Sequence, residues 1–350
     1  MNKHLKLAAV WSLGLVFVVS AQGAEDKKGL MIGGSFEGGY AHGWSDTTAK
    51  QSQFFIDDLN MKFNVNVSDK IKVVIDEHFA ANQKGATANL FNSKDANFNN
   101  LTLASANDDF QMSAQSAYVE HKCSDHMTTQ FGYVRTPFGM ENMWARYDSH
   151  SYYYSSGFAT AQSRGFNADM GIKTTYTGMG NLEVALLGGR QGSGQFDNMP
   201  SVSARWSTDM KVGGITIMPV ASTYLGRWRG GPLDVGTSAG ANMKMGMFAA
   251  NLEYMYGSQN TDDTDAGKTK NHTVWVEPMV DLGVVNVSAK VDYHSDKVAA
   301  ADSTSDWNVS GAVTHEWDKL RIRAAYSNRN LQNNTAAKAH DFRIMFGTKF

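Results

Sequence analysis

The chain has 350 residues, of which 42% are hydrophobic and 19% charged, and its formal net charge is −2. This charge excludes the strongly basic surface that binds nucleic acid, and a mean hydropathy of −0.37 excludes a bundle of membrane-spanning helices. The single cysteine excludes an intrachain disulfide and a CxxC zinc pattern.

The first 24 residues are typical of a secretory signal peptide. Lys3 and Lys6 precede the apolar stretch 7–19, and residues 21–24 (AQGA) offer small residues for cleavage. The apolar stretch is short for a spanning helix, although an uncleaved anchor stays an alternative. We therefore expect residues 1–24 to be removed on export and residues 25–350 to form the mature domain, with 30 basic and 34 acidic residues.

After this segment, apolar and polar residues alternate with the period of a β-strand. The alternation is clearest at 58–67, 285–294, 307–314, 320–327 and 341–347. No segment after the signal shows a sustained helical period. The sequence therefore predicts an all-β protein.

The predicted connections alternate between short and long. The short ones are 68–70, 124–126, 177–181, 207–214, 244–247, 281–283 and 318–319. The long ones are 43–51, 80–109, 136–163, 191–199, 229–234, 259–271, 296–304 and 329–339. These fifteen connections join sixteen strands and place both chain ends on the side of the short turns. Weak signals near 207–214 and 229–240 could change the strand count by two.

An even number of strands, with short turns on one rim and long loops on the other, is typical of an outer-membrane barrel. Closure is required in lipid because every backbone group must be paired there. Aromatic residues near the predicted strand ends fit interfacial girdles. We therefore predict a transmembrane antiparallel β-barrel of about 16 strands. A secreted β-sandwich or soluble barrel with the same period is the alternative.

A barrel of this size is too wide for its own side chains to fill, so its lumen holds water. Strand parity predicts which charged residues point inward. The inward bases are Lys62, Lys72, Lys173, Arg205, Lys244, Lys290, Arg321, Arg323 and Arg343. The inward acids are Glu37, Asp58, Asp76, Glu120, Asp169, Glu183, Glu253, Glu277, Asp292 and Glu316. The near balance predicts a pore that discriminates weakly between ions.

The predicted inward charges are distributed unevenly at one place in the pore wall. Arg321, Arg323 and Arg343 lie inward on the last two strands, next to the first strand after closure. Together with Lys62 and Lys72 they form the predicted basic pore wall. In the alternative interpretation, the arginines pair with Glu37 and Glu316 and only stiffen the wall.

The stretch 117–143 (AYVEHKCSDHMTTQFGYVRTPFGMENM) carries the most specific motif. It resembles the porins related to the phosphate-selective porins, in which a strand and a turn precede a Gly-x-x-(basic)-Thr-Pro-Phe-Gly-x-Glu run. The matching residues are Gly132, Arg135, Thr136, Pro137, Phe138, Gly139 and Glu141. The resemblance implies a channel, a homotrimer and a third long loop folded into the lumen as a constriction. Residues 136–163 are the third long connection by our own count.

The predicted constriction residues are Arg135, Glu141, Arg146 and Asp148. Glu141 and Asp148 would face the arginine wall across a narrowed water path and create a transverse field. Alternatively, these carboxylates pair with Arg146 or anchor the loop to the wall. Phosphate selectivity would need many more inward bases, so the balanced charges favour a general diffusion pore.

The chain ends in Phe350, with Phe346, Ile344 and Phe342 on the same face. This end resembles the last strand of bacterial outer-membrane proteins, which the barrel assembly machinery reads, although Thr348 departs from the apolar residue usual there. The resemblance implies the outer membrane of a Gram-negative bacterium, where lipid and lipopolysaccharide surround the barrel.

The sequence contains no HExxH metal motif. We predict no catalytic, metal or cofactor site and no enzyme activity. The predicted function is passive diffusion of small hydrophilic solutes and ions. A pore that prefers anions or sugars, a barrel enzyme and an adhesive or structural surface barrel are the alternatives.

Overall fold

The computed structural model describes residues 29–45, 50–82, 111–143, 155, 168–188, 200–227, 233–260, 268–298, 303–332 and 339–350. The predicted signal peptide lies outside these residues. No helix among them is long and apolar enough to cross a membrane.

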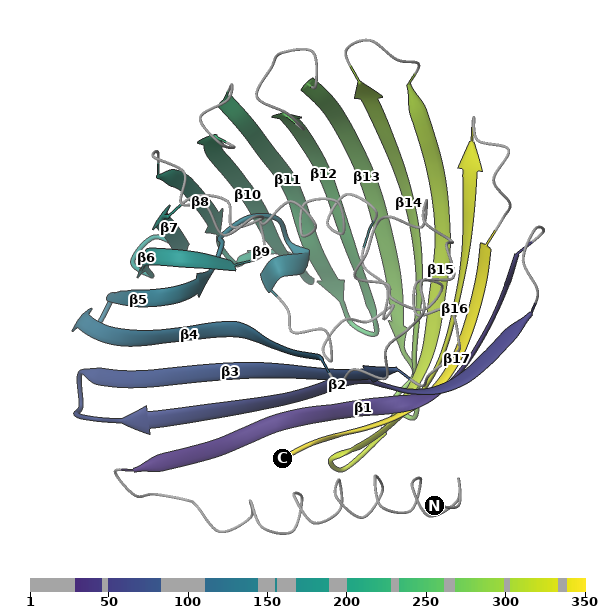
Figure 1. Ribbon diagram of the computed structural model, residues 1–350, viewed down its shortest axis with the longest axis horizontal. Helices are drawn as coiled ribbons and strands as arrows, with labels where there is room; N and C mark the ends of the chain where they lie inside the picture. The colour runs from purple at the N-terminus through teal and green to yellow at the C-terminus, as the bar shows by residue number, and fades with distance from the viewer. Residues whose placement is uncertain are drawn as a thin grey trace.

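The described chain is built almost entirely of strands (Figure 1). The first six are β1 (Leu30–Ser45), β2 (Gln51–Asn66), β3 (Ile71–Asn82), β4 (Gln111–Ser124), β5 (Met127–Arg135) and β6 (Ala168–Tyr176). The next six are β7 (Asn181–Leu187), β8 (Ser201–Ser207), β9 (Met210–Val212), β10 (Ile215–Arg227), β11 (Leu233–Met245) and β12 (Phe248–Asn260). The last five are β13 (Lys268–Asp281), β14 (Asn286–Val298), β15 (Thr304–Trp317), β16 (Leu320–Gln332) and β17 (Ala339–Lys349).

Sequential antiparallel pairing closes these strands into a barrel. Strand β1 pairs with both β2 and β17, so the sheet has no free edge at the chain ends. Strands β8 and β9 both pair with β10 and are two parts of one strand. The described residues therefore form sixteen strands around the ring, as predicted. Phe350 continues the closure by exchanging backbone hydrogen bonds of 3.1 and 3.0 Å with Gly34.

The short and long connections fall where the sequence predicted them, with two corrections. The predicted turn 207–214 is too long, because Met210–Val212 still pairs with β10. The reversal lies at Gly213, whose φ of 61° is easily adopted by glycine. The third connection is longer than predicted, since β6 begins only at Ala168. The strand order was predicted from the alternation of residues within the strands, which does not depend on where each loop begins and ends. Both corrections therefore leave the strand order unchanged.

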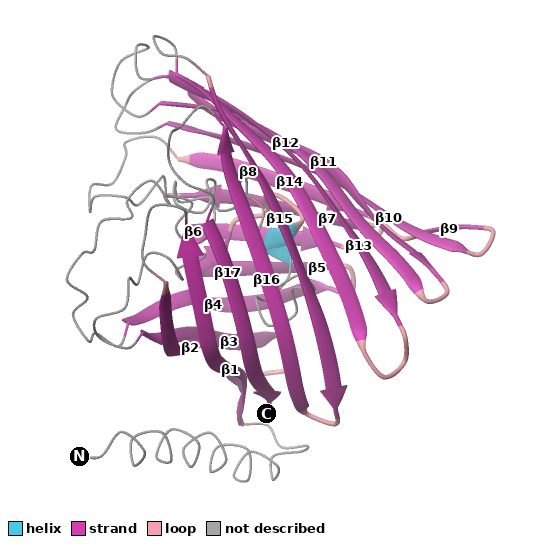
Figure 2. Ribbon diagram, turned by 90° about the vertical axis from the view of Figure 1, so that its right-hand side faces the viewer, coloured by secondary structure: helices cyan, strands magenta, loops and turns pink. Residues whose placement is uncertain are grey.

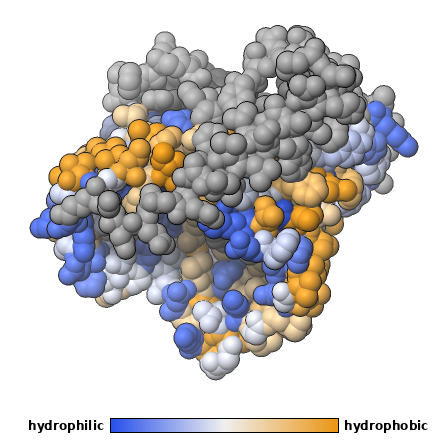
Figure 3. All heavy atoms as spheres, turned by 90° about the horizontal axis from the view of Figure 1, so that it is seen from below, coloured by the Kyte–Doolittle hydropathy of each residue, from blue (hydrophilic) through white to orange (hydrophobic). Residues whose placement is uncertain are grey.

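The two faces of the barrel have opposite chemistry. On β13, the outward Val274 and Val276 are 51% and 44% exposed, whereas Thr273, Trp275 and Glu277 between and beside them are at most 2% exposed. Figure 3 shows apolar residues on the outer sides and hydrophilic residues around the central hollow. In a water-soluble protein the apolar side chains are buried and the polar ones exposed, whereas here the apolar side chains face outward. This arrangement fits a wall with lipid outside and water inside.

Several of the aromatic side chains predicted for interfacial girdles lie on the outward face. Tyr254, Trp206 and Tyr326 are among the exposed large side chains. The hydroxyl of Tyr326 lies 2.8 Å from Nδ1 of His340, and the His340 ring stacks on Trp44 with centroids 4.9 Å apart. Such rings pack apolar faces toward lipid and keep polar atoms paired.

Candidate functional site

The chain enters the lumen directly after β5. The segment 136–143 is buried at all but its last residue, and it ends in a short 3-10 helix, η2 (Glu141–Met143). The hydroxyl of Ser203 on β8 donates to the Pro137 carbonyl over 3.0 Å, and the Gly139 amide donates to Ser222 on β10 over 2.9 Å. The start of the third loop therefore lies against the inner wall formed by β8 and β10, three and four strands along the ring from β5. Figure 2 shows the cyan helix inside the ring.

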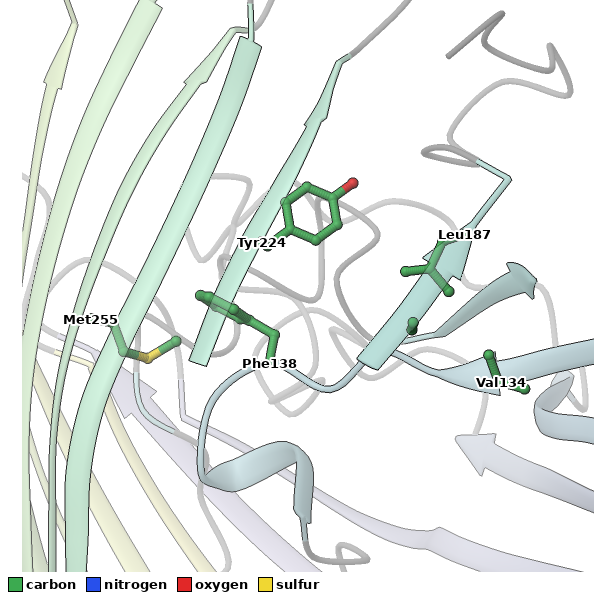
Figure 4. Close-up of a cluster of buried hydrophobic side chains, with 6 residues drawn as sticks. Val134, Phe138, Leu187, Tyr224 and Met255 are labelled. Atoms are coloured by element: carbon green, nitrogen blue, oxygen red, sulfur yellow. The ribbon is translucent and has the colours of Figure 1, made fainter. Parts of the chain in front are cut away.

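Phe138 holds this segment by apolar packing. Its ring joins a buried cluster from β5, β7, β10 and β12 (Figure 4): Val134, Ala185, Leu187, Tyr224 and Met255. A side chain at Gly236 on β11 would place its Cβ 3.0 Å from the Phe138 ring, so glycine lets the ring approach this strand closely. The cluster is a local apolar core inside a polar lumen, and it forms only because the loop folds inward.

A buried ion pair fixes the next residue of the loop. Glu141 on η2 pairs with Lys290 on β14, and their side chains are 3% and 2% exposed. The same carboxylate accepts hydrogen bonds from the Ser155 amide over 3.0 and 3.1 Å and from the Ser155 hydroxyl. One carboxylate thus ties two points of the loop, fourteen residues apart, to the barrel wall. We refer to Glu141, Ser155 and Lys290 as the loop anchor.

Neighbouring strands complete the surroundings of the anchor. The Lys290 ammonium lies 4.4 Å from the centroid of the Trp275 ring on β13, a cation–π contact. Trp275 Nε1 donates to Glu253 on β12 over 3.2 Å, and Glu253 accepts the Met140 amide over 2.8 Å. Met140 packs in turn on Trp275. Each buried polar group here has a partner, which is the condition for a stable buried network.

A second charged network holds the loop from the other side. Arg205 on β8 donates through Nε to Glu183 on β7 over 2.7 Å and through Nη1 to the Gly139 carbonyl over 3.1 Å. Lys173 on β6 approaches the same Glu183 at 3.4 Å. Arg205 therefore couples a charge pair of the wall to the loop backbone.

The structure describes two of the four predicted constriction residues, Arg135 and Glu141. Glu141 takes the anchoring role, which was the alternative to facing the arginine wall. Arg135 lies 3.9 Å from Asp76 on β3. Arg146 and Asp148 lie outside the described residues, so their part in a constriction stays a prediction.

The three arginines of the predicted basic wall each lie beside an acid. Arg323 lies 3.5 Å from Glu37, and Arg321 donates through Nε to Glu316 over 2.7 Å, which is the pairing of the alternative interpretation. Arg343 donates to Asp341 over 2.8 Å.

The two wall lysines, Lys62 and Lys72, are half-buried. They lie opposite Asp76 and Glu120 in the strand register. Their role in ion selectivity stays a prediction.

Sequence reasoning missed Trp275, Ser155 and Gly236. The tryptophan carried a usable signal, because it shares strand parity with Thr273 and Glu277 on the polar face. A large aromatic on that face indicates a partner inside the lumen. Ser155 and Gly236 gave no such signal, since small residues fit either face.

Catalytic and metal chemistry were also considered on the inner wall. The Thr273 hydroxyl lies 2.7 Å from Nδ1 of His294, whose Nε2 lies 3.1 Å from Asp296. Thr273 is 1% exposed, so a substrate has no access to its hydroxyl, and the contact is structural. The described residues contain no group of three or more potential metal ligands.

No family model matches the chain, and no curated protein matches its sequence. Solved structures share its fold. The outer membrane channel DcaP of Acinetobacter baumannii is 11% identical with a TM-score of 0.63, covering 94% of this chain and 99% of that one. An anion-selective porin from Comamonas acidovorans is 10% identical with a TM-score of 0.61, covering 92% and 99%.

OmpT, an outer membrane protein of Vibrio cholerae solved in a trimer form, is 10% identical with a TM-score of 0.61, covering 92% and 99%. At these identities the likeness concerns the fold. The phosphate-selective porin family suggested by the 117–143 stretch has no match. The chain has the sixteen-strand fold of outer-membrane barrels.

Proposed function

We propose that this protein is an outer-membrane channel for the passive diffusion of small hydrophilic solutes and ions. The observation that carries the proposal is the inner face, where charged residues such as Glu277, Lys290 and Arg323 line a closed barrel whose outer face is apolar. A barrel of sixteen strands leaves room for water between such walls. No energy source or cofactor is needed for movement down a gradient.

The third loop sets the size limit in this proposal. Its start crosses the lumen and is held there by the loop anchor and by Phe138. Because the contacts lie on β8, β10, β12 and β14, the loop narrows the passage from one side of the barrel to the other. A narrowed, water-lined passage admits small polar solutes and excludes large or apolar ones.

Export, membrane placement and assembly are part of the proposal. Residues 1–24 direct export, the barrel sits among lipid and lipopolysaccharide, and Phe350 contributes to recognition by the assembly machinery. A homotrimer is supported by the sequence resemblance and by the trimer form of the similar OmpT.

Single-channel recording in a planar bilayer tests the function. We expect discrete, long-lived conductance steps, grouped in threes, and a small reversal potential under a salt gradient. A strong anion preference that phosphate blocks would favour the selective alternative. A folded barrel that carries no current would refute the channel and favour an enzyme or an adhesive surface barrel.

A further inference from the structure

The outward face of β3 carries a carboxylate in the middle of the strand. Glu77 shares this face with Val73 and the exposed Ile75, and it lies opposite Met61 in an unbroken part of the register with β2. Glu77 is six residues beyond Ile71, which begins β3 at a short turn. This separation is about 20 Å along the strand and about 15 Å along the barrel axis at a tilt of about 40°. Glu77 therefore lies within the apolar band, about 25 Å tall, that a barrel presents to lipid.

An outward acid sets β3 apart from the other strands. Among the outward strand positions whose side chains the structure describes, Glu77 is the one acidic residue. On the far side of the ring, the outward residues of β13 include the exposed Val274 and Val276. A charged side chain against lipid is destabilising, and ionisable groups at membrane depth mark functional contacts. A protein surface that supplies a hydrogen-bond donor suits this carboxylate better than lipid does.

The barrel wall that follows β3 and β4 is low. Strands β5 and β6 have nine residues each and β7 has seven, whereas β13 has fourteen. Seven residues rise about 23 Å along a strand and about 18 Å along the barrel axis at the same tilt. Strand β7 is therefore too short to cross the apolar band. The backbone beyond its ends would meet hydrocarbon, where unpaired polar groups are not tolerated.

A hydroxyl on the same side of the barrel complements the carboxylate. Tyr133 on β5 lies on the outward face, opposite Ala117 of β4 and the exposed Met170 of β6. Within the described residues, no hydrogen bond or ion pair involves the Tyr133 hydroxyl or the Glu77 carboxylate. This side therefore presents a donor and an acceptor that the chain does not pair with each other. We refer to the outward side chains of β3–β7 as the low face.

We propose that the low face binds a second copy of this chain, with Tyr133 of one copy donating a hydrogen bond to Glu77 of the next. The inference rests on the homotrimer of the proposed function and names the face that forms it. In a closed ring of three copies, each low face is turned toward the common axis. One kind of contact then removes all three short walls and all three carboxylates from lipid. The longer strands, such as β13, remain at the lipid perimeter.

The variant Glu77→Leu gives opposite results for a protein contact and a lipid contact. If Glu77 binds a second copy, its loss should lower the temperature at which the purified oligomer dissociates into folded monomers by several degrees, as followed by native gel electrophoresis. The control Thr237→Leu makes a similar polar-to-apolar change at an exposed outward position of β11, on the other side of the ring, and should have no effect. An unchanged or raised dissociation temperature for Glu77→Leu would show that the carboxylate faces lipid, and would refute the proposal.

The variant Tyr133→Phe removes a single hydroxyl and tests the pairing itself. It should also lower the dissociation temperature, whereas Tyr293→Phe on the outward face of β14 should leave it unchanged. Combined with Glu77→Leu, the loss of the Tyr133 hydroxyl should cause no further decrease, because both changes remove the same hydrogen bond. Decreases that add in the double variant would refute the pairing of Tyr133 with Glu77.

Planar bilayer recording of the unmodified protein separates this proposal from the channel function. A purified chain that stays monomeric and conducts in single, ungrouped steps would refute the second copy as the partner and leave the channel intact. An oligomer that carries no current, yet dissociates more readily after Glu77→Leu, would refute the channel and support the interface. If Glu77→Leu fails to fold, the conservative Tyr133→Phe and its control still decide the question.

Discussion

Replacing Lys290 by methionine should release the third loop and widen the pore. Methionine keeps much of the apolar stem of the lysine and removes the charge that pairs with Glu141 and lies over the Trp275 ring. Glu141 would then be a buried carboxylate without its cation. Breaking a buried pair by removing one partner costs about 3–5 kcal/mol. At about 1.4 kcal/mol for each factor of ten, the balance between docked and released loop shifts by about two to three and a half powers of ten.

Release is the expected outcome because Glu141 regains water only by leaving the wall. The Met140 amide and the Phe138 cluster still hold part of the segment, so the barrel itself should remain folded. Single-channel conductance should rise, and liposome swelling should extend to larger sugars. The control Lys297→Met lies on the same strand with an outward, exposed side chain and should change neither measurement.

A charge exchange distinguishes attraction from simple disruption. Glu141→Lys combined with Lys290→Glu restores opposite charges at the same two positions, and we expect it to recover the narrow pore that each single change loses. A folded Lys290→Met barrel with unchanged conductance and sugar cutoff would show that the loop anchor does not set the opening. An exchanged pair that conducts like the single variants would show that the attraction is not the cause.

Two further substitutions follow from the packing. Gly236→Leu should push the Phe138 ring out of its cluster and raise conductance, whereas Gly214→Ala, placed where nothing lies within 4 Å, should not; equal conductance of both would contradict the role of the cluster. Val274→Arg should destabilise the barrel by about 2–4 kcal/mol near the bilayer midplane, whereas Val284→Arg at a 70% exposed turn position should be nearly neutral. Urea unfolding in lipid vesicles measures both, and equal stabilities would argue against a lipid-facing Val274.

The barrel could be predicted from sequence because the face on which each side chain lies follows from a local alternation along the strand. In a strand, residues two positions apart share a face, so the alternation at Val274, Trp275 and Val276 places each side chain without knowledge of its neighbours. The same parity placed Glu253 and Lys290 inward, and both are buried there. Turn signals added the strand order, since short hairpins leave each strand beside the next.

The contacts of the third loop could not be predicted because they follow no local period. Glu141 and Lys290 are separated by 149 residues, and strand parity says which face each occupies without saying what lies opposite across the lumen. The sequence analysis offered both anchoring and pore lining for Glu141. The choice between them depends on how far the segment after Pro137 reaches into the barrel, and that reach depends on the space left by Gly236 on a distant strand.

The loop anchor also bears on the transverse field that the sequence predicted, because it pairs one of the two loop carboxylates. The predicted transverse field needed a free Glu141 carboxylate on the loop and uncompensated arginines on the opposite wall. The structure pairs Glu141 with Lys290 and places Glu37 and Asp341 beside the wall arginines Arg323 and Arg343, so these described charges cancel in pairs.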